Sequence, residues 1–126
     1  MLLDSHVVLW WVDGSSRLGH DAKQLIDQAP TVHVSSATVL ELTIKSMIGR
    51  LHLADDFESE LWQIGFEPLS ITPAHAAGLR AFPELERHDP FDRMLLSQAR
   101  LEQFDLVTAD SVLLDLGLPF VIDARS

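Results

Sequence analysis

The feature of this sequence that most restricts its fold is the alternation of short strand-like runs with helix-like runs along the chain. Short strands are expected at residues 1–4, 31–34, 66–71, 106–108 and 120–122. Strands that alternate with helices are typical of a parallel sheet covered by helices on both faces. We therefore expect an α/β fold, a three-layer αβα sandwich with four or five short parallel strands, in a single domain over residues 1–126.

Local start and stop signals place the helices between these strands. Thr72-Pro73 and Asp89-Pro90 each combine an N-cap residue with a proline at the first helical position. Pro30 and Gly49 are typical helix-stop residues after two earlier apolar-periodic runs. The expected helices cover residues 7–12, 20–28, 37–48, 55–64, 73–79, 90–103 and 111–115.

Composition excludes several classes of protein. With 47% hydrophobic and 22% charged residues the chain is not disordered, and with no cysteine it has neither disulfides nor thiolate metal sites. No apolar run reaches the roughly 20 residues that a membrane span needs, and the first residues lack the basic region of a signal peptide. We expect a cytoplasmic protein without a membrane partner.

The net charge of −10 gives the chain no long-range attraction for nucleic acid. Net charge does not locate charges, however. A cluster of acidic residues that binds divalent cations reverses its own local field once it is loaded. The charge balance therefore does not exclude an RNA substrate.

Four acidic residues fall where a parallel sheet collects its ligands, at the carboxyl ends of the strands. Asp4 ends the first strand, and Asp110 follows the strand at residues 106–108. Glu41 lies in the first turns of the helix after the second strand, and Asp92 lies in the first turn of the helix that Asp89-Pro90 opens. We expect these side chains to lie close together.

Each acidic residue also has a local structural role available. Asp4 and Asp110 can cap the helices that follow them, and Asp92 suits the positive end of a helix dipole. Glu41 can complete a capping box with Thr38, or form a surface pair with Lys45 one turn later. These alternatives stay open at this stage.

Convergence of the four carboxylates indicates a site for a hard divalent cation. Neighbouring carboxylates repel one another, and burial makes their ionisation harder still. Mg²⁺ and Mn²⁺ resolve that conflict because they prefer oxygen ligands, and such a site suits phosphodiester hydrolysis. The sequence has no Walker A loop, GxGxxG motif or nucleophile elbow that would indicate a different chemistry.

The same residues carry a resemblance that covers nearly the whole chain. Its segments are residues 2–6, 40–45 with 49–51, 88–93 and 108–110. In their order and spacing, the chain resembles a PIN-domain ribonuclease, and specifically a VapC-type toxin of a type II toxin–antitoxin pair. The resemblance implies a PIN-like αβα sandwich, a metal-dependent endoribonuclease activity, an RNA substrate and a cognate antitoxin. It also implies a homodimer.

The resemblance assigns roles to individual residues. It implies that Asp4, Glu41, Asp92 and Asp110 are the catalytic residues and hold Mg²⁺ or Mn²⁺, with Asp4 and Asp92 as the firmest ligands. Ser5 and Thr108 match hydroxyl positions that support this cluster, Ser5 standing where threonine is commoner. Asp89 is interpreted as a helix cap rather than a ligand.

RNA contacts are less well defined by the sequence. Arg93 follows Asp92 directly and Lys45 lies one turn from Glu41, so each is a candidate for a phosphate contact. Further candidates are Arg17, Arg50 and Arg87. The histidines beside the ligands, His6 and His88, are interpreted as structural, with tuning of the site as the alternative. The tryptophans Trp10, Trp11 and Trp62 are interpreted as core or interface anchors.

Two other functions fit parts of the pattern. One is a receiver-like or phosphatase-like phosphoryl-transfer domain with Asp4 as the phosphate acceptor. His6 counts against it, because it occupies the place where a dehalogenase-like phosphatase has a second aspartate. The other is a non-catalytic PIN-like interaction domain, which differs from the ribonuclease in lacking metal-dependent cleavage.

Overall fold

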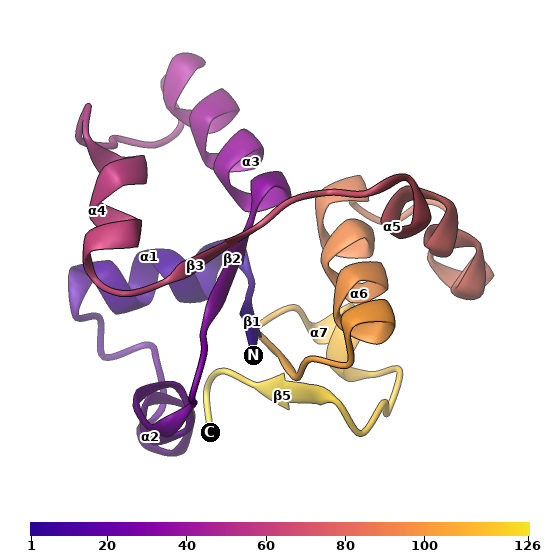
Figure 1. Ribbon diagram of the computed structural model, residues 1–126. Helices are drawn as coiled ribbons and strands as arrows, with labels where there is room; N and C mark the ends of the chain where they lie inside the picture. The colour runs from indigo at the N-terminus through magenta and orange to yellow at the C-terminus, as the bar shows by residue number, and fades with distance from the viewer.

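The computed structural model describes residues 1–126 and has a five-stranded parallel sheet at its centre (Figure 1). The strand order is β3-β2-β1-β4-β5. The strands are β1 (Leu2–Leu3), β2 (His33–Ser35), β3 (Glu67–Leu69), β4 (Leu106–Thr108) and β5 (Val121–Asp123). All four neighbouring pairs are parallel, so the α/β prediction with a short parallel sheet is confirmed.

Helices cover both faces of this sheet. The α-helices are α1 (Ser5–Asp13), α2 (His20–Gln28), α3 (Ser36–Met47), α4 (Phe57–Gln63), α5 (Pro73–Ala77), α6 (Pro90–Glu102) and α7 (Ser111–Leu114). Two 3₁₀ helices, η1 (Gly78–Ala81) and η2 (Pro83–Leu85), lie between α5 and α6. In Figure 1, α1, α2 and α4 lie on one side of the strands, and α5, α6 and α7 lie on the other. None of these helices has the length and apolarity that a membrane span requires.

The core consists of two apolar clusters separated by the sheet. Successive residues of a strand point to opposite faces, so Leu3 belongs to the cluster under α1, α2 and α4 while Leu2 belongs to the cluster under α6. Both leucines are fully buried. This two-sided burial explains why the central strands read as continuous apolar runs rather than as alternating ones.

Element boundaries differ from the predictions by one or two residues at several ends, including those of α1 and α5. Helix α1 begins at Ser5 rather than at Val7, because the Asp4 side chain accepts a hydrogen bond from the Val7 amide and caps the helix earlier. Helix α5 ends at Ala77, and the chain continues as the 3₁₀ helix η1 instead of extending the α-helix to Leu79. The second 3₁₀ helix, which Pro83 opens, was not predicted from the sequence.

We expect Leu96→Ala to lower the free energy of unfolding by about 2–5 kcal/mol, because it leaves a cavity between α6 and the sheet. Leu96 is fully buried in the second apolar cluster. The matched control is Leu101→Ala on the same helix, where the leucine is 40% exposed. Urea denaturation measures both, and equal losses for the two variants would contradict the assigned core.

Candidate functional site

The site begins where two adjacent strands end. Strand β1 pairs in parallel with β4, with Leu3 opposite Val107. The carboxyl ends of the two strands therefore lie at the same edge of the sheet. Asp4 follows β1 as the N-cap of α1, and Asp110 follows β4 as the N-cap of α7. Both residues therefore cap helices, as the structural alternative predicted. Both carboxylates also line the same cavity.

Asp4 is the most tightly held of the acidic residues, with 2% of its surface exposed. Its Oδ1 accepts a hydrogen bond of 2.9 Å from the Val7 amide, and its Oδ2 accepts hydrogen bonds from the Thr108 hydroxyl and the Ala109 amide. Burial raises the pKa of Asp4, and these hydrogen bonds oppose that rise. Thr108 therefore supports the carboxylate position, as the resemblance implied.

Glu41 enters from α3 and is fixed from two sides. Its Oε1 accepts a hydrogen bond of 2.6 Å from the Ser5 hydroxyl, and its Oε2 lies 2.7 Å from the Lys45 ammonium. The capping-box alternative is wrong, because the N-cap of α3 is Ser35, whose hydroxyl accepts from the Ala37 amide. The i,i+4 pair with Lys45 is present, but Glu41 is 7% exposed and so is not a surface residue.

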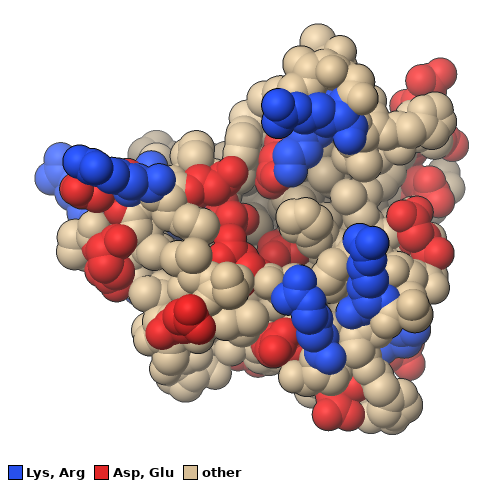
Figure 2. Space-filling model, turned by 180° about the vertical axis from the view of Figure 1, so that it is seen from behind, with Lys and Arg blue, Asp and Glu red and all other residues tan.

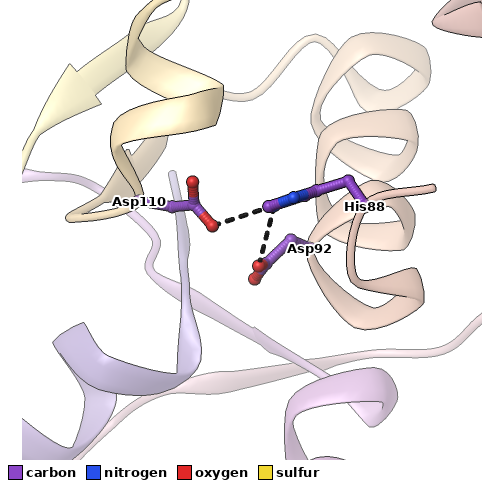
Figure 3. Close-up of side chains that lie close together, drawn as sticks. All are labelled: His88, Asp92 and Asp110. Atoms are coloured by element: carbon purple, nitrogen blue, oxygen red, sulfur yellow. Dashed lines mark hydrogen bonds and ion pairs between the residues drawn. The ribbon is translucent and has the colours of Figure 1, made fainter. Parts of the chain in front are cut away.

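The carboxylates of Asp92 and Asp110 both lie beside the imidazole of His88 (Figure 3). The His88 Nε2 atom lies 3.0 Å from Asp110 Oδ2 and 3.4 Å from Asp92 Oδ2. Ligand atoms of the three residues all lie within 4.8 Å of one another. Asp92 reaches this point from the first turn of α6, where Asp89 caps the helix by accepting from the Phe91 and Asp92 amides. The interpretation of Asp89 as a cap is confirmed.

The pKa values of the Asp92 and Asp110 carboxyl groups are shifted in opposite directions. Burial, together with the Asp110 carboxylate and the negative charges of Asp89 and Asp4, raises the pKa of Asp92 to about 8. Burial acts in the same direction on Asp110, but hydrogen bonds from Asp92, His88 and two α7 amides outweigh it and lower the pKa of Asp110. The pair thus retains a proton at neutral pH when no cation is bound.

All four predicted acidic residues line one cavity of about 200 Å³. Its other lining residues are Ser5, His6, Trp10, Lys45, Asp89, Ala109 and Arg125. Viewed from behind Figure 1, acidic side chains enter a hollow near the centre of the surface, and basic side chains stand at separate points around it (Figure 2). The structure therefore brings Asp4, Glu41, Asp92 and Asp110 together, and their roles as ligands stay a prediction.

Arg93 does not join this cavity. Its Nη1 donates to the carbonyl oxygens of Leu85 and Glu86, at 3.4 and 3.0 Å, and the side chain lines a separate cavity beside η1. This placement does not favour the phosphate contact predicted for Arg93. Lys45 does line the acidic cavity, but its ammonium is paired with Glu41.

Sequence reasoning assigned no definite role at the site to three residues that lie in the cavity wall or beside it. His88 was interpreted as structural, with tuning of the site as the alternative; it lies directly before the N-cap of α6, and its Nε2 is 3.4 Å from Asp92 Oδ2. Trp10 was interpreted as a core or interface anchor; it is 9% exposed and lines the cavity as well. Arg125 carried no signal, because nothing in the sequence places residues 124–126 beside β4.

The donor set fits a hard divalent cation. Every candidate ligand except His88 offers carboxylate oxygen, which Mg²⁺ and Mn²⁺ prefer. The only basic side chain within ion-pair distance of the Asp92 carboxylate is the His88 imidazole at 3.4 Å, and burial together with the neighbouring carboxylates raises the pKa of Asp92. A cation at this point supplies the missing charge.

Comparisons with known proteins bear on the family and the fold of this chain. The family model described as the PIN domain matches residues 1–117. The chain is 35% identical over 112 residues to "Ribonuclease VapC22" of Mycobacterium tuberculosis, covering 87% of this chain and 86% of that protein.

Two solved structures share the fold. A toxin–antitoxin complex from Klebsiella pneumoniae has a TM-score of 0.68 at 17% identity, covering 98% of this chain and 96% of that one. VapBC2 from Rickettsia felis, bound to a DNA fragment from its promoter, has a TM-score of 0.65 at 16% identity, covering 96% and 94%. The predicted PIN-like αβα fold is confirmed.

The raised pKa of Asp92 predicts a pH-dependent stability in EDTA. The neutral acid is favoured in the folded state, so the Asp92 contribution is fully present below the unfolded pKa of 3.8 and is lost as the pH rises to about 8. We expect the melting temperature to fall over this window by less in Asp92→Asn than in the wild type. The exposed Asp115→Asn control should keep the wild-type dependence.

Saturating Mg²⁺ should remove most of the fall in wild-type melting temperature, since the cation replaces the proton. Identical pH profiles for wild type and Asp92→Asn in EDTA would show that the Asp92 carboxylate is not held in a proton-sharing pair.

Proposed function

This chain belongs to the PIN-domain family, and on that basis we propose that residues 1–126 form a single nuclease domain that hydrolyses RNA phosphodiester bonds with Mg²⁺ or Mn²⁺. The observation that carries the proposal is the meeting of Asp4, Glu41, Asp92 and Asp110 in one cavity. These residues come from four separate segments of the chain. A purely structural role for each acidic residue would not require them to converge.

Asp4 and Asp92 would hold the cation most directly, Glu41 would complete the site, and Asp110 would bind directly or through a water molecule. A divalent cation in such a site lowers the pKa of bound water and offsets the charge that develops on the phosphoryl and leaving oxygens. The chain's own hydroxyls orient the ligands. Thr108 fixes Asp4, and Ser5 fixes Glu41.

His88 controls the relation between Asp92 and Asp110. Its Nε2 lies between their Oδ2 atoms and holds both carboxylates near one point at the cavity wall. The imidazole is itself held in place, since only 21% of its side-chain surface is exposed. Its role is therefore positioning.

The biological role that follows is that of a toxin held in check by a cognate antitoxin protein. The relative from M. tuberculosis carries the name of a VapC ribonuclease, and both structural neighbours are complexes of toxin with antitoxin. We place this chain in the cytoplasm with RNA as its substrate. A homodimer remains a prediction of the resemblance.

The phosphoryl-transfer alternative fits the geometry poorly. Asp4 Oδ1 accepts one hydrogen bond and keeps a lone pair for a cation, but the residue is 2% exposed and a covalent phosphoryl group on it would have to break into this buried, hydrogen-bonded arrangement. The non-catalytic alternative keeps the same fold, so cleavage activity discriminates it from the ribonuclease.

We expect purified protein to cleave RNA with Mg²⁺ or Mn²⁺ and to stop cleaving in EDTA. Asp4→Asn and Asp92→Asn should each lower the rate by about a hundredfold or more, since loss of a few kcal/mol of charge stabilisation costs tenfold in rate per ~1.4 kcal/mol. The matched control is the exposed Asp115→Asn, which makes the same charge change away from the cavity. Gel analysis of labelled RNA measures the rates.

Circular dichroism should show that these variants keep the wild-type fold. Cleavage at the wild-type rate by both cavity variants would refute the assigned site. Cleavage by none of the proteins, wild type included, would favour the non-catalytic interaction domain.

Induced expression in bacteria should arrest growth if the enzyme acts as a toxin, because it would degrade cellular RNA. Asp92→Asn should relieve the arrest, and Asp115→Asn should not. The measurement is optical density and colony count after induction at equal protein levels. Active enzyme without arrest would leave a ribonuclease that is not a toxin.

A further inference from the structure

The residues that follow strand β5 are fixed beside the acidic cavity by backbone hydrogen bonds. The Ala124 amide donates to the Thr108 carbonyl, and the Ala124 carbonyl accepts from the Gly19 amide, both at 2.8 Å. The Ser126 carbonyl accepts from the Asp21 and Ala22 amides in the first turn of α2. These contacts hold the backbone on both sides of Arg125, so its side chain starts from a defined position.

Gly19 shows how close this contact is. A Cβ atom added at Gly19 would lie 2.0 Å from the Ser126 carbonyl oxygen, so only glycine admits residues 124–126 at this point. Sequence position 19 therefore helps to set where residue 125 lies.

The guanidinium of Arg125 is oriented by two groups at the cavity. Its Nη1 donates a hydrogen bond of 2.8 Å to the carbonyl of Ala109, the residue directly before Asp110. Its Cζ lies 5.7 Å from the ring centroid of Trp10. A guanidinium carries five N–H groups, and this single protein hydrogen bond leaves the others available to a ligand.

Arg125 has no ion pair, although it lines a cavity with five carboxylates. The other lysine or arginine in the lining, Lys45, is neutralised by Glu41 at 2.7 Å. Arg125 is also exposed. The cavity thus has one accessible and uncompensated guanidinium, held in place by an aromatic ring and a carbonyl.

We propose that Arg125 binds a phosphate of the RNA backbone beside the phosphodiester that is cleaved; this inference rests on the proposed function. The planar guanidinium fork matches two phosphate oxygens, and a phosphate at this rim also offsets the repulsion that the carboxylates exert on the RNA. Trp10 and the Ala109 carbonyl are positioning groups for Arg125. The sequence-based candidate for this role, Arg93, is engaged with carbonyl oxygens of the segment before α6.

The test is RNA binding in the cleavage-deficient Asp92→Asn background, measured by fluorescence anisotropy with a labelled single-stranded RNA of mixed sequence. KCl is varied at a fixed Mg²⁺ concentration. Arg125→Ala should weaken binding about tenfold at low salt and lower the slope of log K against log salt by about 0.7, the contribution of one phosphate contact on a single strand. Arg125→Lys should keep the slope, because the charge remains, and recover only part of the affinity.

The matched control is Arg80→Ala, which removes an exposed arginine that lines a different cavity. It should leave the slope unchanged. An unchanged slope in Arg125→Ala, or an equal fall in Arg80→Ala, would overturn the phosphate contact while leaving the proposed ribonuclease intact. Wild-type protein that neither binds nor cleaves RNA with Mg²⁺ or Mn²⁺ would overturn the proposed function, and this inference with it.

Discussion

The parallel pairing of β1 with β4 is the constraint on which the site depends. Leu2 and Leu3 lie opposite Leu106 and Val107, and all four side chains are fully buried, so the register cannot slip without moving leucines from one core to the other. This register brings Asp4 beside Thr108, whose hydroxyl donates to the carboxylate. The apolar core and the acidic cavity are therefore consequences of the same strand alignment.

Much of this arrangement could be predicted from local sequence signals. The positions of Asp4 and Asp110 follow from the rule that parallel sheets collect ligands at the carboxyl ends of their strands. Contacts between distant segments could not be predicted. The His88 imidazole between Asp92 and Asp110 depends on the course of residues 78–89 through two 3₁₀ helices, and the placement of Arg125 depends on the close approach at Gly19.

Charge explains how an acidic protein can act on RNA. The net charge of −10 repels a polyanion at long range, but the carboxylates that create part of this charge are concentrated in one cavity. Burial and the neighbouring carboxylates raise the pKa of Asp92 to about 8 there, so the folded protein holds a proton where it can instead hold a cation. The proposed cation and Arg125 together would turn the local field from repulsive to attractive for phosphate.

The most direct test of this account is the position of a metal ion in crystals of the wild-type protein grown with Mn²⁺, located by anomalous scattering. The account predicts a strong anomalous peak inside the cavity, within coordinating distance of carboxylate oxygens of Asp4 and Asp92. Crystals at saturating Mn²⁺ that show no peak among Asp4, Glu41, Asp92 and Asp110 would contradict it.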